Sequence, residues 1–404
     1  MSMTAILLLA LAQDWPQFRG PDGQGHAKAT VAPQKWSDGS DNIKWSVPID
    51  GLGWSSPVAA DGKVWLTTAT EGNKSLRVMA VDLSDGKIVH NVEVFRVENA
   101  GTAHKKNSYA SPTPILDKDR VYVHFGPNGT ACLSTDGKVH WKQQQLKYNP
   151  VHGAGGSPAL VAGHLIFTCD GLTDPYVAAL DAKTGAPAWK TPRDNAGEPK
   201  KFSFCTPLAI EVGKSTQVVV PGAGAVQSLD PATGRVLWSV RYPNGYSVVP
   251  RPVYGHGMVY FSSGFDRPVL LAVKVDGKGD VTDTHVAWRL EKGAPLEPSP
   301  LLVEDELYTV SDQGIASCID ATTGKPHWQE RLGGSYSASP VLVGGLIYFQ
   351  AEDGTTTIVK ADKAFTKVAS NQVKGKTYAS LAPVEGALLL RTDSRLLRIE
   401  PEAK

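Results

Sequence analysis

A unit repeated eight times is the feature that most constrains this sequence. Seven copies open with a proline-marked apolar run, the eighth has a degenerate form of it, and most copies end in a glycine turn followed by a segment that contains tryptophan. Steps of 40 to 55 residues, each holding four short strand patterns, are typical of β-propeller blades. The openings are Ser56-Pro57, Ser111-Pro112, Ser157-Pro158, Thr206-Pro207, Arg251-Pro252, Ser299-Pro300, Ser339-Pro340 and Ser380-Leu381.

The third copy shows the pattern most clearly. Residues 158–161, 164–169 and 176–180 are predicted strands, 181–185 a glycine-containing turn, and 186–190 a fourth strand around Trp189. Together they predict one four-stranded antiparallel blade. A large aromatic side chain at the same place in successive copies is expected to pack between neighbouring blades, because one blade cannot bury both of its faces.

The eighth copy predicts how the ring closes. Residues 378–400 supply only three strands, and the missing fourth is found at 42–47, around Trp45. We therefore expect an all-β, eight-bladed propeller whose N-terminal strand completes the last blade, with seven blades as the alternative if two weak copies merge. The predicted divisions are a signal peptide at 1–12, an N-terminal extension at 13–42 and a single propeller domain at 43–404.

The first twelve residues predict export. A short apolar run ends in Ala10-Leu11-Ala12, which resembles a signal-peptide cleavage site and is too short to span a bilayer. No cysteine follows it for a lipid anchor, so we expect a monomeric periplasmic or extracellular protein without a membrane span. Four widely spaced cysteines permit disulfides or buried thiols, and the sequence does not choose between them: Cys132, Cys169, Cys205 and Cys318.

Charge and motifs exclude several functions. The chain has 41 basic and 40 acidic side chains, a balance that argues against a nucleic-acid partner. It has no phosphate-binding loop, zinc spacing or nucleophile motif. Residues 276–283 suggest a calcium loop but lack the residues that an EF-hand needs, so we expect a long hairpin in the fifth blade and no metal.

The repeats resemble those of the PQQ-like propeller superfamily, which includes quinoprotein dehydrogenases and the assembly factor BamB. The resemblance covers nearly the whole chain after residue 13, and its opening segment, Asp14 to Pro21, resembles that of a group of secreted bacterial propellers. The motifs that carry it are 180–185 with Trp189, 229–234 with Trp238, and 319–324 with Trp328.

The resemblance predicts the fold more specifically than the activity. Quinoprotein dehydrogenases hold PQQ with calcium and a disulfide between adjacent cysteines, and this chain has no adjacent cysteines. No cofactor is therefore expected, and we predict a noncatalytic, BamB-like scaffold that binds an envelope or secreted protein or peptide. The alternatives are a PQQ-dependent oxidoreductase and a carbohydrate-binding or carbohydrate-cleaving propeller.

The candidate site is the mouth of the central channel, on the face where inter-blade links and second-to-third-strand turns meet. No catalytic residue is predicted. The candidate ligand-binding residues, at the approach to each first strand, are Trp54, Tyr109, His152, Phe204, Arg251, Glu297, Tyr336 and Tyr378. The alternative is that these side chains only fill the axis of the channel. The candidates in turns on the same face, where Asp-Gly pairs also read as ordinary hairpin turns, are Asp170, Asp266, Arg267, Asp312 and Asp353.

Overall fold

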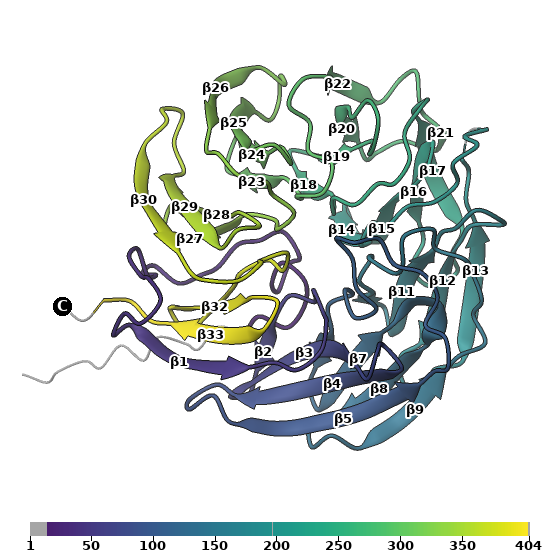
Figure 1. Cartoon of the computed structure of the whole chain (residues 1–404). Helices are drawn as coiled ribbons and strands as arrows, with labels where there is room; N and C mark the ends of the chain where they lie inside the picture. The colour runs from purple at the N-terminus through teal and green to yellow at the C-terminus, as the bar shows by residue number, and fades with distance from the viewer. Residues whose placement is uncertain (1–13, 196, 403–404) are drawn as a thin grey trace, which may run out of the picture.

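Eight antiparallel sheets arranged in a ring make up the fold (Figure 1). The computed structural model describes residues 14–195 and 197–402, so the predicted signal peptide lies outside the described residues. Each sheet contains the four antiparallel strands of one blade, and the sheet of blade 4 has a short fifth strand as well. The innermost strand has three residues in every blade except blade 4, where it has five. The eight-bladed prediction is confirmed. Within the described residues, one 3-10 turn at Gly126–Asn128 interrupts the all-β structure, and no helix is long and apolar enough to cross a membrane.

The blades follow one another in chain order. From the channel outward, blades 1 to 4 contain β2 (Val58–Ala60), β3 (Lys63–Thr70), β4 (Ser75–Asp82), β5 (Ile88–Arg96); β6 (Ile115–Asp117), β7 (Arg120–His124), β8 (Thr130–Ser134), β9 (Val139–Gln143); β10 (Ala159–Val161), β11 (His164–Cys169), β12 (Tyr176–Asp181), β13 (Pro187–Pro192); and β14 (Leu208–Val212), β15 (Ser215–Pro221), β16 (Ala225–Leu229), β17 (Val236–Arg241).

The remaining blades repeat the same order. Blades 5 to 8 contain β18 (Val253–Gly255), β19 (Met258–Ser262), β20 (Leu270–Lys274), β22 (Val286–Leu290); β23 (Leu301–Val303), β24 (Glu306–Val310), β25 (Ile315–Asp320), β26 (Pro326–Arg331); β27 (Val341–Val343), β28 (Leu346–Gln350), β29 (Thr355–Lys360), β30 (Lys367–Gln372); and β31 (Ala382–Val384), β32 (Ala387–Arg391), β33 (Arg395–Ile399), β1 (Ile43–Pro48).

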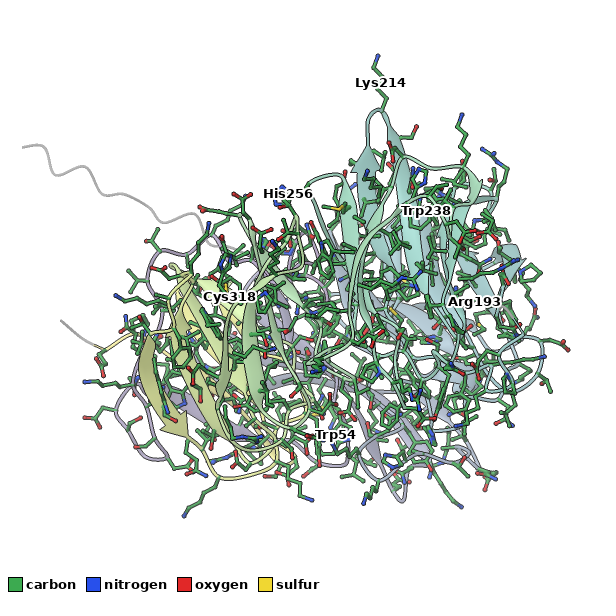
Figure 2. All side chains as sticks on the ribbon, turned by 90° about the horizontal axis from the view of Figure 1, so that it is seen from above. Trp54, Arg193, Lys214, Trp238, His256 and Cys318 are labelled. Carbon is green, nitrogen blue, oxygen red and sulfur yellow. The ribbon has the colours of Figure 1, made fainter. Side chains whose placement is uncertain are left out.

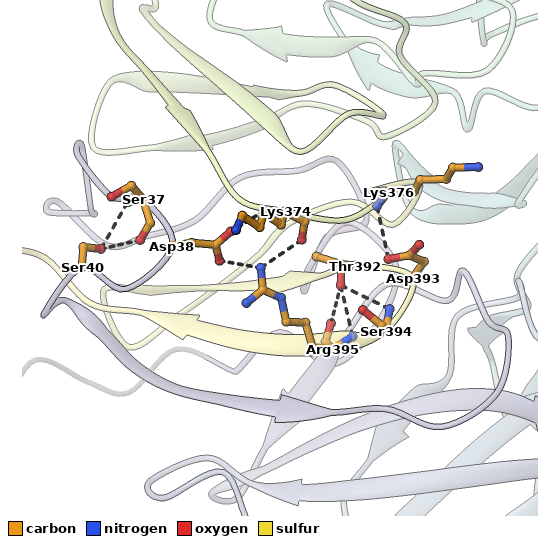
Figure 3. Close-up of polar contacts among 9 residues, drawn as sticks. All are labelled: Ser37, Asp38, Ser40, Lys374, Lys376, Thr392, Asp393, Ser394 and Arg395. Atoms are coloured by element: carbon orange, nitrogen blue, oxygen red, sulfur yellow. Dashed lines mark hydrogen bonds and ion pairs between the residues drawn. The ribbon is translucent and has the colours of Figure 1, made fainter.

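The ring closes as predicted, because β1 pairs antiparallel with β33 and supplies the outer strand of blade 8. Residues 37–40 reinforce this closure (Figure 3). The Asp38 carboxylate accepts hydrogen bonds from the Lys374 backbone N–H and from Arg395, whose guanidinium also donates to the Lys374 carbonyl at 2.9 Å. The segment before β1 is thereby fastened to both blade 7 and blade 8.

Tryptophans of the outer strands pack against the following blade. The Trp141 indole donates to the Ala182 carbonyl at 3.1 Å, and a Cβ added at Gly185 would lie 2.5 Å from its ring. Glycine is needed in that turn because the ring lies on it and its φ is +75°. Trp45 makes the same contact with blade 1, donating to the Leu83 carbonyl at 2.9 Å. The predicted role of these aromatics between blades is confirmed.

Two sequence expectations are refined by the strands. In blade 2 the first strand begins at Ile115, after Thr113-Pro114, so the predicted opening at Ser111-Pro112 is wrong by two residues. The hairpin at 276–283 lies between β20 and β22, as expected, and its β21 (Gly279–Asp280) also adds a parallel fifth strand to β17 of blade 4. The four cysteines are all buried and free.

A segment of the N-terminal extension, residues 15–25, closes one end of the channel and is called the base plug. Trp15 is fully buried and exchanges backbone hydrogen bonds with Ala59 of blade 1. Arg19 donates to the Pro300 carbonyl at 2.7 Å and to the Pro340 carbonyl at 3.3 Å, which lie at the starts of blades 6 and 7. The extension is thus an integral part of the ring.

Candidate functional site

An axial cavity of about 460 Å³ lies at the mouth, the end of the channel opposite the base plug. Figure 2 shows Trp54, which lines this cavity, and Lys214, at the tip of the β14–β15 turn, on opposite faces of the ring. The links that precede all eight first strands contribute side chains to the lining, as does the β19–β20 turn. Phe18 of the base plug also lines it, so the plug forms part of the floor of the cavity.

Hydroxyl groups form the deep end of this cavity. Seven of the eight blades place a serine or threonine immediately before the first-strand proline or its equivalent, and all seven side chains are buried and line the cavity. We call this set the floor ring, and its members are Ser56, Thr113, Ser157, Thr206, Ser299, Ser339 and Ser380.

The floor ring ties neighbouring blades together around the axis. Each of its oxygens accepts a backbone N–H from the preceding blade; for example, the Ser380 N–H donates to Ser56 Oγ at 3.0 Å across the closure of the ring. In blade 5, Arg251 takes the place of the hydroxyl residue. Its Nε donates to the Pro207 carbonyl at 3.1 Å and its Nη1 donates to the Phe18 carbonyl at 2.6 Å.

One wall of the mouth is a mixed-charge cluster. Lys106, from the link between blades 1 and 2, reaches Glu352 of blade 7 with an Nζ–Oε1 distance of 2.8 Å and Glu297 with a distance of 3.8 Å. The Ser337 hydroxyl contacts both carboxylates. Burial opposes the charge on Lys106, but its hydrogen bond to Glu352 and the surrounding carboxylates outweigh it and raise the pKa of Lys106.

Asp312 lies behind this wall. Its Oδ2 accepts the Leu296 backbone N–H at 2.8 Å. Burial, with a contribution from the charge of Glu297, raises the pKa of Asp312 to about 6, although the Leu296 hydrogen bond opposes the shift. Asp312 itself is outside the lining of the cavity.

The other walls are aromatic. The His104 and His152 rings meet at 5.4 Å, and His152 packs against Phe202 and Phe204 at 5.3 and 6.0 Å. Burial and the neighbouring His104 lower the pKa of His152, which favours its neutral form. Apolar and aromatic walls with a few polar groups are typical of sites for small ligands or peptide side chains.

Two further contacts complete the aromatic lining. The Trp54 and Tyr378 rings lie 4.7 Å apart where the last and first blades meet. Lys200 Nζ lies 4.0 Å from the centre of the Tyr246 ring, and the Tyr246 hydroxyl donates to Asp266 at 2.8 Å.

Five of the eight predicted ligand-binding residues line the cavity: Trp54, His152, Phe204, Glu297 and Tyr378. Among the turn candidates, Asp266 lines it. The other three predicted ligand-binding residues lie outside its lining. Tyr109 donates its hydroxyl to the Gly101 carbonyl at 2.8 Å, Arg251 is buried beneath the floor ring, and Tyr336 is buried in the core between blades 6 and 7.

The remaining turn candidates are also placed away from the cavity lining. Asp170 is buried, and its Oδ1 lies 3.2 Å from Arg193 Nε. Burial raises the pKa of Asp170 to about 6, with Arg193 opposing the shift. Arg267 and Asp353 are exposed, and Asp353 accepts the Thr355 backbone N–H within its own turn.

Several lining residues are absent from the predicted set. The serines and threonines before the prolines mark the repeat, and their recurrence at the start of an innermost strand is the signal that could have revealed the floor ring. Lys106 lies in a long link, and neither Ser337 nor Phe18 carries a local signal for the mouth. Among residues 14–195 and 197–402, no group of three or more histidine, cysteine or acidic side chains is placed to hold a metal ion.

Comparisons with known proteins agree with this architecture. The BamB of Moranella endobia is 23% identical over 274 residues, which cover 64% of this chain and 66% of that protein, so the chain spans slightly less than two thirds of that relative. The BamB structure from Moraxella catarrhalis superposes with a TM-score of 0.65 at 15% identity, covering 88% of this chain and 96% of that one.

Enzymes share the fold too. The quinohemoprotein alcohol dehydrogenase from Comamonas testosteroni superposes with a TM-score of 0.68 at 12% identity, covering 97% of this chain and 81% of that one. A family model described as outer membrane protein assembly factor BamB matches residues 34–152, 104–282 and 277–369. Since these matches span most of the sequence, the chain belongs to that BamB family of PQQ-like propellers.

Proposed function

We propose that this protein is an exported, noncatalytic binding scaffold of the cell envelope, and that its mouth receives an extended segment of a partner protein. The observation that carries the proposal is the axial cavity. All eight blades help to line it, and Phe18 of the base plug forms part of its floor. The BamB relatives, named as outer membrane protein assembly factors, support the envelope part of the proposal. In this proposal residues 1–12 direct export and are removed.

The dimensions and chemistry of the cavity favour a peptide segment over a folded surface. A volume of about 460 Å³ accommodates a few side chains. The aromatic walls bury apolar side chains, while Lys106, Glu297 and Glu352 offer charges of both signs at the opposite wall. A segment with mixed character therefore finds complementary groups on both sides.

The residues at the mouth do not fit the quinone and calcium pair of the dehydrogenases. Calcium needs six or more oxygen ligands, with carboxylates prominent among them. Two of the carboxylates at the mouth, those of Glu297 and Glu352, instead contact the ammonium group of Lys106 and the hydroxyl of Ser337. These two carboxylates are therefore not free to hold a calcium ion beside a quinone.

A photocrosslinking experiment tests the proposal. Phe265 lines the cavity and is 38% exposed, so a benzophenone amino acid at that position would point a reactive group at a bound segment. The matched control places the same amino acid at Lys214, on the opposite face. We expect one identifiable envelope protein to be crosslinked from position 265 in the native host, and not from position 214, and to be lost in a Tyr378→Ala background.

Other outcomes would contradict the proposal. Equal crosslinking from both positions, or none from either, would remove the mouth as a protein-binding site. Retention of a glycan on an array, abolished by Trp54→Ala, would favour the carbohydrate alternative. A quinone absorbance acquired on incubation with PQQ and calcium, together with dye reduction by an alcohol, would favour the oxidoreductase alternative.

A further inference from the structure

The floor ring offers hydrogen-bond donors that no protein group uses. Each of its seven oxygens already accepts one backbone N–H, at 2.9 or 3.0 Å, from the preceding blade. None of the seven hydroxyls donates to another atom of the described residues, although each side chain is at least nine-tenths buried. The deep end of the cavity is therefore rich in unused O–H donors.

Buried positive charge surrounds this ring. Arg251 occupies the eighth position, Arg19 donates to carbonyls next to Ser299 and Ser339, and Arg391 donates to the carbonyl and hydroxyl of Ser55, next to Ser56. All three guanidiniums are at most 3% exposed, and none forms an ion pair with a carboxylate of the described chain. The Nε atoms of Arg19 and Arg391 are buried without a hydrogen-bond partner.

Burying an unpaired cation is unfavourable, because the charge loses its hydration without a compensating partner. Burial accordingly lowers the pKa of Arg19 and Arg391 to about 9 and that of Arg251 to about 10. The charge of Asp22 partly opposes this lowering of the pKa of Arg19 and Arg251, but the Asp22 carboxylate also lies 3.4 Å from His26 Nδ1. An anion held on the axis would offset this accumulated positive potential.

The carboxylates at the mouth do not supply that anion. Glu297 and Glu352 are paired with Lys106, Asp266 is paired with Lys200 at 3.3 Å, and Asp312 accepts the Leu296 N–H. The carboxylates at the rim thus have partners of their own, whereas Arg19, Arg251 and Arg391 form no ion pair with a carboxylate of the described residues.

We propose that the floor ring is an oxyanion site that binds a carboxylate. The proposal deepens the proposed function and rests on it for its biological ligand, because the simplest source is the C-terminus or an acidic side chain of the bound segment. A free small carboxylate has the same chemistry. Hydroxyl donors from several blades would contact its oxygens, and the positive potential of the three buried guanidiniums would stabilise its charge.

Fluorine NMR with trifluoroacetate as the probe tests the site on the full-length purified protein. We expect saturable broadening of the trifluoroacetate signal, and no such effect on the neutral control trifluoroethanol. In the double variant Thr113→Val/Thr206→Val, which keeps side-chain shape and removes two donors, binding should weaken at least tenfold. The matched variant Thr113→Ser/Thr206→Ser keeps both hydroxyls and should bind within about threefold of the wild type.

Trifluoroacetate broadening that the valine variant leaves unchanged, or that trifluoroethanol reproduces, would overturn the oxyanion site. Since the valines also remove two inter-blade acceptors, thermal melts must show that the variant is folded. If it is not, crystals of the wild type soaked in selenate decide: an anomalous peak within hydrogen-bond distance of the floor ring supports the site, and its absence overturns it.

The source of the carboxylate is identified separately. Once a partner segment is known from crosslinking, synthetic peptides with a free or an amidated C-terminus, and with or without an acidic side chain, reveal which carboxylate is bound. Trifluoroacetate binding without any crosslinked partner would leave a site for small carboxylates and remove the proposed scaffold function. Crosslinking without trifluoroacetate binding would remove only the oxyanion site.

Discussion

The two ends of the channel are built in opposite ways. At the base, Trp15 and Arg19 are buried; the Trp15 backbone pairs with blade 1, and two guanidinium nitrogens of Arg19 donate to carbonyls at the starts of blades 6 and 7. At the mouth, long links leave a cavity with half-buried charges and aromatic rings. The contrast teaches that a segment outside the repeat, the base plug, decides which end of the channel is closed and which end is left as an open cavity.

The largest expected effect is on the free energy of unfolding, when a tryptophan of the base and a tryptophan of the mouth are each replaced by alanine. Trp15 is fully buried in the core cluster, so Trp15→Ala should lower the free energy of unfolding by about 3 to 5 kcal/mol. Trp54 is half-buried beside Tyr378, and Trp54→Ala should lower it by only about 1 to 2 kcal/mol. Urea denaturation of both variants measures the difference, and equal losses would refute the contrast.

A glycine pair measures how tightly the base is packed. Gly23 and Gly39 both have positive φ, at +71° and +81°. A Cβ at Gly23 would collide with the Arg251 guanidinium, whereas one at Gly39 would meet nothing within 4 Å. Gly39→Ala therefore reports backbone strain alone, about 1 kcal/mol, and Gly23→Ala should destabilise the protein by about 1 to 2 kcal/mol more. Similar decreases in melting temperature for the two variants would show that Arg251 and the base plug can move to accommodate the added methyl group.

The mouth should carry a stability cost that changes between pH 4 and 7.5, a range in which the buried arginines of the base, with pKa values of about 9 and 10, stay charged. The pKa of Asp312 is about 6 in the folded state, above its ordinary value, so stability falls as pH rises from about 4 to 6 and stays lower above that range. Asp312→Asn should therefore stabilise the protein by about 1 kcal/mol at pH 7.5 and by little at pH 4. Asp170 also has a raised pKa, but it is present in both the wild type and the Asp312→Asn variant, so its effect cancels in the stability difference between them. Denaturation at both pH values checks this, and a gain independent of pH would contradict it.

Periodicity explains what the sequence could and could not predict. The pairing of the Trp45 strand with the last blade followed from counting strands, because a ring needs a fourth partner there. Thr113 was missed since two serine or threonine residues each precede a proline in that segment, and only the strand start distinguishes them. Tyr336 was assigned to the mouth by its position in the repeat, but side-chain packing turned it into the core between blades.

Features outside the repeat were harder to predict. The base plug, which contains Trp15, Phe18 and Arg19, has no strand periodicity in its sequence. Its path across the channel could therefore not be predicted from the hydrophobic pattern. Lys106 pairs with Glu352 at a separation of 246 residues, which no local signal encodes. The sequence therefore predicted where a mouth would be, and the structure was needed to show what charges meet there.

The smallest expected effect concerns whether the rim and the floor of the cavity act separately. Lys106 and Glu352 are part-exposed, so Lys106→Gln should lower the free energy of unfolding by only about 0.5 to 1 kcal/mol. Lys74→Gln, in a more exposed pair with Glu98, should lower it by less.

Without Lys106 the two glutamates at the rim repel anions, so trifluoroacetate binding should weaken about twofold to threefold at low salt and recover at high salt. Titrations at two ionic strengths measure this. A loss as large as that of Thr113→Val/Thr206→Val, persisting in salt, would mean that Lys106 contacts the anion directly, and the distinction between a charged rim and a donor floor would no longer hold.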